Sequence, residues 1–355
     1  MVSDRTANVA LIGYGVGGRF FHAPIISATR GLRLAAVVSS NADRANEARA
    51  EHPDARVVKS AEELFNDASG LDVAVISTAN SAHVPLALAA IEAGLHVVVD
   101  KPIAPTSAEA RRIVAEADRR KLMLTVYHNR RYDGDFLTLQ RLISEHALGE
   151  IHRFESRLER WRPIPKPGWR ESGDPAEAGG LLFDLGPHLI DQALVLFGTV
   201  TYVYAEIDRR RKNVEVDDDV FLALTHASGV RSHIWLSVLA AQKGPRFRVL
   251  GDRAAYTKFG MDVQEDALRR GELPRGVDWG VEPSEHWGTL GDGEDLRPVP
   301  SEPGDYRNFY AGVVAAIRDG ERPPVDPRDA VAGLEIIEAA RTSASERRVV
   351  AITGN

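Results

Sequence analysis

Three ionisable residues in the stretch 179–191 have a spacing that would let them act together in catalysis or metal binding. Asp184, His188 and Asp191 stand at positions i, i+4 and i+7 among mostly apolar neighbours. On an α-helix this spacing places all three on one face. A histidine oriented by a carboxylate is a typical general acid–base pair near neutral pH. The same side chains could instead bind a metal ion, or form a polar helix face around a hydrogen-bonded histidine.

A lysine follows one of the apolar runs that we expect to be strands. The sequence Asp100-Lys101-Pro102 comes directly after residues 95–99, which read Leu-His-Val-Val-Val. In an open α/β sheet, ligands bind beyond the carboxyl ends of the strands. Lys101 is therefore a candidate for contact with a substrate, and a solvated surface lysine is the alternative.

A glycine-rich segment follows the first apolar run, residues 8–12. It reads Gly13-Tyr14-Gly15-Val16-Gly17-Gly18 and fits the pattern G-x-G-x-x-G. Such glycines let the backbone turn tightly and approach a pyrophosphate at a helix N-terminus. We therefore predict dinucleotide binding here, against the alternative of an ordinary glycine-rich turn. Pro24 interrupts the helix that should follow, which predicts a short helix or one that restarts near His22.

The end of the second expected strand indicates which dinucleotide is bound. An acidic residue about 20 positions after the glycines usually holds the ribose hydroxyls of NAD. Here the strand ends in Ser39-Ser40-Asn41, followed by Arg44. Hydroxyls and a guanidinium suit a 2′-phosphate, which a carboxylate would repel. We predict a preference for NADP, with NAD as the alternative cofactor and a solvated helix position as the alternative role of Arg44.

The order of the expected elements predicts two domains. In residues 1–126, near-continuous apolar runs alternate with helical stretches, as in a parallel sheet that is buried on both faces. The runs are residues 8–12, 34–38, 72–77, 95–99 and 122–127, and the helical stretches include 85–93 and 106–121. The second helical stretch opens with Thr106-x-x-Glu109, a capping box.

In residues 127–355, β-rich runs follow one another instead of alternating with helical stretches. This pattern predicts an α+β domain with an open, mostly antiparallel sheet. The β-rich runs are residues 200–207, 220–226, 230–239 and 247–258. We expect a long surface loop over residues 273–305 and a closing helix over 326–345. The apolar run 230–239 contains Trp235 and predicts an exposed apolar sheet face, hence a homodimer or homotetramer.

Composition excludes several classes of function. The chain has 355 residues and no cysteine, so disulfides, thiolate catalysis and cysteine-ligated metals are ruled out. Its formal net charge of −7 argues against a nucleic-acid partner. No uncharged apolar run is long enough to span a bilayer, and residues 1–6 do not resemble a signal peptide. We expect a cytoplasmic protein with no membrane partner.

Taken together, these motifs resemble the Gfo/Idh/MocA oxidoreductase family, over essentially the whole chain. The glycine loop, Asp100-Lys101-Pro102 and the stretch 179–191 occur in the family's order and approximate spacing. Four further segments resemble the branch of NADP-dependent scyllo-inositol dehydrogenases: residues 21–24, 127–131, 169–170 and 264–269. The resemblance implies a Rossmann domain followed by an α/β domain that forms oligomer contacts.

The resemblance also implies hydride transfer between NADP and a hydroxyl or ketone carbon of a sugar or cyclic polyol, with a scyllo-inositol-type substrate favoured. It gives catalytic roles to Lys101, Asp184 and His188, and it argues against a metal site at Asp184, His188 and Asp191. The implied cofactor contacts are Gly13, Tyr14, Gly15, Val16, Gly18, Ser39, Ser40, Arg44, Thr78, Ala79, Asn80, His83, Asp100, Lys101 and Asn129, with weaker support for Trp169, Arg170 and Tyr306.

The chain departs from the family pattern at two positions. Asp100 replaces the usual glutamate before the lysine, and Ala79 replaces the usual proline before Asn80. Neither change removes a catalytic group. The alternatives are a sugar-ketone reductase, an NAD-assisted glycosidase, or a sensor that binds the dinucleotide without catalysis.

Overall fold

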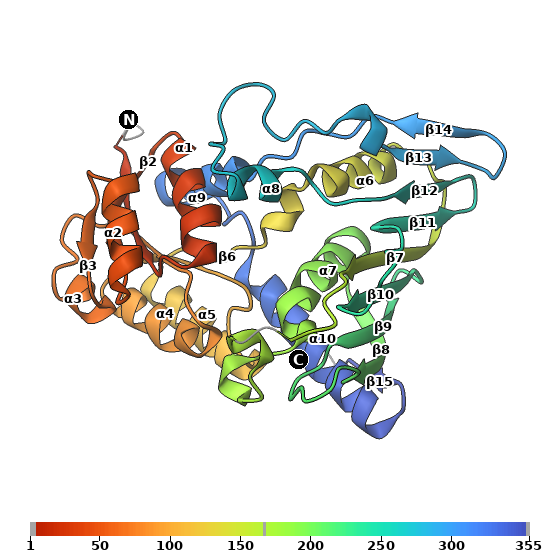
Figure 1. The fold of residues 1–355 in the computed structure, drawn as a ribbon, viewed down its shortest axis with the longest axis horizontal. Coiled ribbons are helices and arrows are strands. Elements are labelled where there is room, and N and C mark those ends of the chain that lie inside the picture. Colours follow the sequence, from red (N-terminus) through yellow and green to blue (C-terminus); the bar gives the residue numbers. More distant parts are fainter. Residues whose placement is uncertain (1–4, 166–167, 353–355) are drawn as a thin grey trace. The chain divides into compact units, whose positions relative to one another are not determined.

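A computed structural model describes residues 5–165 and 168–352 of the chain. Within these residues the chain forms two compact units (Figure 1). Unit 1 contains residues up to 132 together with 264–279 and 305–330, and unit 2 contains residues 133–263, 280–304 and those from 331 onward. The sequence predicted a single boundary after residue 126, whereas the structure assigns two later segments to unit 1.

Unit 1 is built on a parallel sheet of six strands in the order β3-β2-β1-β4-β5-β6. Its strands are β1 (Ala7–Ile12), β2 (Leu32–Val38), β3 (Arg56–Val58), β4 (Val73–Ile76), β5 (His96–Val99) and β6 (Leu124–Val126). The strand order reverses between β1 and β4, and such a switch point opens a crevice for ligands at the carboxyl ends of the strands. The predicted parallel sheet is confirmed.

Helices connect these strands as the alternating pattern predicts. The connecting helices are α1 (Ala23–Ala28), α2 (Ala42–Glu51), α3 (Ala61–Asn66), α4 (His83–Glu92) and α5 (Ser107–Arg120). Unit 1 also contains α8 (Gln264–Arg269), α9 (Arg307–Asp319), the π-helix η1 (Gly17–His22) and the short 3-10 helices η2 (Asn80–Ala82) and η3 (Asn129–Tyr132). The Thr106 hydroxyl caps α5 by accepting from the Glu109 backbone N–H. The chain restarts at α1 after η1, as Pro24 predicted, because a proline fits the first turn of a helix.

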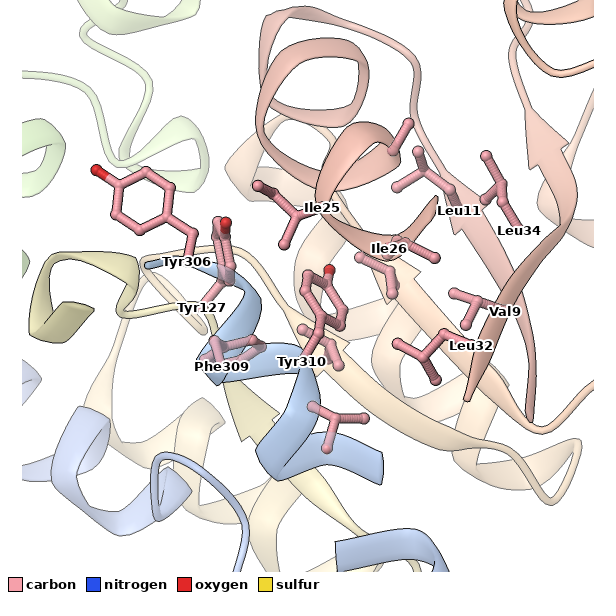
Figure 2. Packing of buried hydrophobic residues seen from close by; sticks show 14 of the residues in the cluster. Val9, Leu11, Ile25, Ile26, Leu32, Leu34, Tyr127, Tyr306, Phe309 and Tyr310 are labelled. Atoms are coloured by element: carbon pink, nitrogen blue, oxygen red, sulfur yellow. The ribbon is translucent and has the colours of Figure 1, made fainter. Parts of the chain in front are cut away.

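The core of unit 1 explains why a late segment belongs to it. Tyr306 and the α9 residues Phe309 and Tyr310 are fully buried in the same cluster as Val9 and Tyr127 (Figure 2). The Tyr127 and Phe309 rings meet edge to face, 4.9 Å apart. Burial of three large aromatic side chains contributes several kcal/mol at about 25 cal/mol per Å² of apolar surface. Nothing in the local sequence of residues 305–330 reveals this long-range packing.

Unit 2 is built on a sheet of nine strands in the order β14-β13-β12-β11-β7-β10-β9-β8-β15. Its strands are β7 (Ile151–Glu159), β8 (Val200–Asp208), β9 (Asp219–His226), β10 (Arg231–Ser237), β11 (Phe247–Gly251), β12 (Ala255–Lys258), β13 (Gly288–Gly291), β14 (Leu296–Val299) and β15 (Val350–Ala351). Only β7 and β10 pair in parallel, so the predicted mostly antiparallel sheet is confirmed.

The stretch 273–305 corrects one expectation. We expected a long surface loop, but it contains η6 (Ser284–His286) and the hairpin β13–β14 at the sheet edge. These strands have four residues each and are rich in glycine, proline and charge, so they lack the apolar pattern of a strand. Pairing with β12 provides the hydrogen bonds that their sequence does not predict.

The remaining helices belong largely to unit 2. They are α6 (Gly134–Ser144), η4 (Trp169–Glu171), η5 (Pro175–Glu177), α7 (Leu181–Phe197) and α10 (Pro327–Glu346). Residues 175–197 are long and apolar enough to cross a membrane, but most of them are buried inside the protein. Because α7 packs against β7, β9 and β10, this segment is a core helix of unit 2.

Candidate active site

The glycine loop leaves no room for side chains at three of its positions. Gly13 has φ +101°, and a Cβ atom there would lie 2.1 Å from the Ser77 carbonyl oxygen. A Cβ on Gly18 would lie 2.0 Å from the Gly13 carbonyl oxygen, and one on Gly17 would lie 2.5 Å from the Ser77 hydroxyl. The loop therefore packs closely against the end of β4 and against itself, at the switch point of the sheet. This cradle fits a dinucleotide pyrophosphate.

The other loop residues differ in exposure. Val16 is exposed, whereas Tyr14 is buried and its hydroxyl donates to Glu51 at 2.6 Å. Burial, reinforced by the hydrogen bond to Glu51, raises the pKa of Tyr14 well above its ordinary value. Arg19 of η1 pairs with Glu47 and Glu51 of α2. These contacts fix α2 against the glycine loop.

The residues predicted to select the dinucleotide lie close to this loop. Ser39 is buried after β2, and Ser40 is exposed. Arg44 lies on α2, where Asn41 caps the helix by accepting from the Arg44 backbone N–H at 3.0 Å. The guanidinium of Arg44 reaches to 3.7 Å from the position of a Cβ on Gly15. The structure therefore brings a cation to the second glycine of the loop.

Asp100 connects the ends of two strands. One carboxylate oxygen accepts from the Lys101 backbone N–H at 2.9 Å, and the other accepts from the Ser77 hydroxyl at 3.1 Å. The second oxygen also lies 3.5 Å from Nε2 of His22. Ser77 follows β4 and Lys101 follows β5, so this one carboxylate holds the lysine beside the switch point.

The environment of Asp100 favours its charged form. Burial opposes ionisation, but the contact with the His22 side chain and the charge of Lys101 hold the pKa of this carboxyl well below its ordinary value. Asp100 is therefore ionised at neutral pH. A carboxylate held this way is an acceptor only, which suits its role toward Lys101 and Ser77.

The segment after β4 contains the next group of predicted contacts. Thr78 and Ala79 are half-buried, while Asn80 and His83 are buried at the start of η2 and α4. Nδ1 of His83 lies 2.7 Å from the Pro102 carbonyl oxygen. Burial lowers the pKa of His83, and this effect exceeds the opposite effect of the hydrogen bond to Pro102. The ring is therefore neutral near pH 7. This histidine thus fixes the turn that carries Lys101.

Two further predicted cofactor residues of unit 1 are largely inaccessible. Asn129 is buried in η3. Tyr306 is fully buried before α9, and its backbone N–H donates to the Gln264 side chain at 2.8 Å. This position favours a role in the core for Tyr306.

In unit 2, the predicted catalytic helix α7 is anchored at its first turn. The Leu181 N–H donates to the Asp217 carbonyl oxygen at 3.0 Å, and the Leu182 N–H donates to the Asp217 carboxylate at 2.6 Å. Gly180, with φ +96°, leaves space for that carboxylate, because a Cβ there would lie 2.2 Å from its Oδ1. Burial raises the pKa of Asp217, although the Leu182 N–H opposes this shift.

Asp184, His188 and Asp191 all lie on α7 and are largely buried. Oδ1 of Asp184 forms an ion pair with Nε of Arg170 at 3.0 Å. Arg170 belongs to η4, together with Trp169. No group of three histidine, cysteine or acidic side chains is arranged to hold a metal ion within residues 5–165 and 168–352.

A cavity of about 270 Å³ adjoins the first turn of α7. Asp184 lines it together with Arg160, Arg162, Arg170 and Asp217. Arg211, another lining residue, is neutralised by Asp218 and Glu171, each at 2.9 Å. The cavity thus combines carboxylates and guanidinium groups with apolar side chains such as Leu181 and Val238, a mixed lining that suits a hydroxylated ring.

Sequence reasoning missed several of these residues. Ser77 and Gly17 touch the Asp100 carboxylate or its neighbours, and Asp217 anchors α7. Only Gly17 lay within a recognised motif. Asp217 stands in the run Asp217-Asp218-Asp219, which resembles a solvated acidic turn, so its buried position has no local signal.

A six-stranded parallel sheet with a glycine loop at its switch point defines a dinucleotide-binding Rossmann domain. Comparison with models of known protein families supports this assignment. Residues 7–128 match the model described as "Oxidoreductase family, NAD-binding Rossmann fold", and residues 140–352 match "Oxidoreductase family, C-terminal alpha/beta domain". The chain belongs to the Gfo/Idh/MocA family of oxidoreductases.

Individual relatives are similar along the whole chain. The chain is 35% identical to the NADP⁺-dependent scyllo-inositol 2-dehydrogenase IolW of Bacillus subtilis, covering 97% of this chain and 96% of the relative. It is 38% identical to the oxidoreductase YdgJ of Escherichia coli, covering 97% and 98%. The solved structure of the oxidoreductase yvaA from Bacillus subtilis superposes with a TM-score of 0.93 at 34% identity, covering 99% of each chain.

The depressed pKa of Asp100 predicts how its replacement affects stability. Asp100→Asn should lower the free energy of unfolding at pH 7, because the carboxylate is stabilised by its neighbours in the folded state. The contribution of this charge to the free energy of unfolding is fully present above the ordinary pKa of 3.8. It is lost as the pH falls toward the lower pKa that Asp100 has in the folded protein. The difference between wild type and variant should therefore be constant from about pH 7 to 5 and shrink below about pH 4, in denaturant titrations.

Ser77→Ala is the matched control for this titration. It removes a neutral hydrogen-bond donor from the same carboxylate. Its effect on stability should depend far less on pH. An Asp100→Asn difference that does not change between about pH 5 and 3 would contradict the assignment of an ionised, stabilised carboxylate.

Proposed function

We propose that this protein is an NADP-dependent dehydrogenase that acts on a hydroxyl carbon of a cyclic polyol or sugar, with a scyllo-inositol-type substrate favoured. The observation that carries the proposal is the glycine cradle beside Ser77 and the Asp100–Lys101 turn, at the carboxyl ends of β1, β4 and β5. The similarity to an NADP⁺-dependent scyllo-inositol 2-dehydrogenase supports the substrate class.

The proposed mechanism gives each candidate residue one task in the reaction. His188 accepts the hydroxyl proton, and a neutral imidazole suits this role near pH 7. Lys101 donates a hydrogen bond to the reacting oxygen and stabilises its developing negative charge. Asp184, paired with Arg170, orients the reacting groups. A nicotinamide dinucleotide held at the glycine loop would supply the acceptor for the hydride of the carbinol carbon.

The cofactor preference that we propose depends on Arg44. Its guanidinium lies near Gly15, and Ser39 and Ser40 follow β2 where an acidic residue would repel a 2′-phosphate. NAD lacks that phosphate and gains nothing from the arginine.

The proposal includes a cytoplasmic location, because the reaction uses a dinucleotide of the cell interior.

Arg44→Ala tests this preference. Loss of a charge-assisted hydrogen bond to phosphate costs on the order of 1.5–3 kcal/mol. The dissociation constant for NADP should therefore rise about 10- to 100-fold, while that for NAD changes little. Fluorescence titration with both dinucleotides measures this, and equal losses for the two would contradict the assignment.

Lys101→Met and His188→Ala test the catalytic roles. Methionine keeps much of the lysine side-chain length without its charge, and alanine removes the proton acceptor. Each variant should bind NADP nearly normally while kcat on scyllo-inositol falls by about 10²–10⁴-fold. In the double variant, kcat should fall by a factor far smaller than the product of the two single factors, because the effects of groups that act together are not additive.

The same assays separate the alternatives. Steady turnover of NADPH with keto-sugars would favour a sugar-ketone reductase, and hydrolysis without net turnover of the dinucleotide would favour an NAD-assisted glycosidase. Dinucleotide binding without turnover on any polyol or sugar would favour a sensor. Near-normal kcat in His188→Ala would reject this residue as the proton acceptor.

We also propose that the protein is a homodimer or homotetramer that associates through the sheet of unit 2. In β10, Ile234 and Leu236 are buried, while Trp235 and His233 alternate with them and remain half-buried. The Trp235 ring lies 5.2 Å from Phe221, and the Arg157 guanidinium stacks 3.8 Å above it. An aromatic and arginine-rich sheet face of this kind suits an interface.

Trp235→Lys tests this proposal by placing a flexible charge in the aromatic face. Light scattering at micromolar concentration should give an oligomer for the wild type and a smaller species for the variant. Val277→Lys is the control, because Val277 is 92% exposed and lies outside this sheet. A wild-type monomer, or an oligomer that Trp235→Lys leaves intact, would argue against the interface.

A further inference from the structure

His22 is a buried histidine for which the proposed reaction has no direct use. It ends η1, and its side chain has no solvent exposure. Its Nδ1 lies 2.6 Å from the Tyr310 hydroxyl, and its Nε2 lies 3.5 Å from Oδ2 of Asp100. The Tyr127 ring packs against it with centroids 4.2 Å apart. Tyr310 comes from α9 and Tyr127 follows β6, within the aromatic cluster of unit 1 (Figure 2).

The two partners determine which ring nitrogen carries a hydrogen. Asp100 is ionised and can only accept, so the favourable arrangement puts a hydrogen on Nε2. Nδ1 faces the Tyr310 hydroxyl, 2.6 Å away. Burial raises the pKa of Tyr310 well above its ordinary value, so this hydroxyl keeps its hydrogen. Tyr310, His22 and Asp100 thus form a connected chain of polar contacts.

The end of this chain fixes the backbone of Lys101. Asp100 uses its other oxygen to accept from the Lys101 N–H at 2.9 Å. Its Oδ2, which faces His22, also accepts from the Ser77 hydroxyl at 3.1 Å, which opposes rotation of the carboxylate. Nε2 of His22 makes no hydrogen bond of ordinary geometry among the residues that the structure describes, and Oδ2 of Asp100 approaches it at 3.5 Å. An Nε2 hydrogen buried here has the Asp100 carboxylate as its acceptor.

We propose that His22 is a positioning residue for Lys101: it holds the Asp100 carboxylate in the rotamer that fixes the Lys101 backbone beside the glycine loop. The inference depends on the proposed function only in that Lys101 acts on the substrate. Its structural part, the coupling from His22 to the Lys101 N–H, can be tested without turnover.

Hydrogen exchange of the Lys101 amide gives that test. Pro102 has no backbone N–H, and the Asp100 N–H is hydrogen-bonded to the Ile76 carbonyl oxygen within the sheet. In a peptide spanning residues 98–102, a change in exchange therefore reports mainly on the Lys101 N–H. His22→Leu keeps an apolar side chain in the core but removes the contact with Asp100. The Lys101 amide should exchange about tenfold faster, while the strands of the sheet keep their protection.

Two variants complete the exchange experiment. His22→Gln retains a donor and an acceptor, and it should restore most of the protection. His226→Leu is the matched control, because His226 is also buried with both ring nitrogens bonded, to Gly198 and Ser232 in unit 2. It should leave the Lys101 amide unchanged even if it lowers the melting temperature as much as His22→Leu does.

Kinetics with scyllo-inositol deuterated at its ring carbons provide the second readout. Misplacement of a catalytic group slows the chemical step, so kcat of His22→Leu should fall about 10- to 100-fold with little change in the KM for NADP. The deuterium isotope effect on kcat should rise, because hydride transfer then limits the rate more fully. A variant that is merely less stable would lose active protein without a change in the isotope effect.

Each outcome has a definite meaning. Unchanged exchange at Lys101 in folded His22→Leu, or equal acceleration at amides throughout unit 1, overturns the proposal. If His22→Leu does not fold, Tyr310→Phe takes its place and should accelerate the Lys101 amide by a smaller factor; no acceleration there also overturns it. If the wild type does not oxidise scyllo-inositol but the exchange results are as expected, the proposed substrate fails and the positioning role stands.

Discussion

The candidate active site of unit 1 depends on one carboxylate. Asp100 accepts from the Lys101 N–H and from the Ser77 hydroxyl, and it lies against Gly17 and His22. These contacts join the ends of β4 and β5 to the glycine loop that follows β1. A charge in this half-buried position is tolerated only because donors surround it. This one carboxylate therefore couples the Lys101 backbone to Ser77 and His22.

The candidate site of unit 2 depends on a second acidic residue in a different way. The Asp217 backbone oxygen and carboxylate accept the first two N–H groups of α7, which fixes the helix that carries Asp184 and His188. Gly180 makes this close approach feasible, since any side chain there would occupy the place of the carboxylate. In both units, glycine provides the space and an aspartate provides the anchor, so the reactive side chains are held by rigid backbone.

The sequence predicted most of this architecture because its signals are local. The buried strands of the parallel sheet in unit 1 are continuous apolar runs, Thr106 caps α5, and Pro24 marks the restart at α1. What could not be predicted depends on partners distant in the chain. The burial of Tyr310 beside His22, the role of Asp217, and the β13–β14 hairpin all arise from packing or strand pairing. His22 itself was part of a recognised segment, but only the structure gives it a neighbour in Asp100.

The most direct test of the account follows the hydride itself. The wild-type protein would be incubated with NADP⁺ and scyllo-inositol that carries deuterium on every ring carbon, and the reduced dinucleotide would be examined by NMR spectroscopy. The account predicts NADPH with a single deuterium on one face of nicotinamide C4, formed in equal amount to the ketone product. Reduced dinucleotide without deuterium, or no reduction with this substrate or with other polyols and sugars, would contradict it.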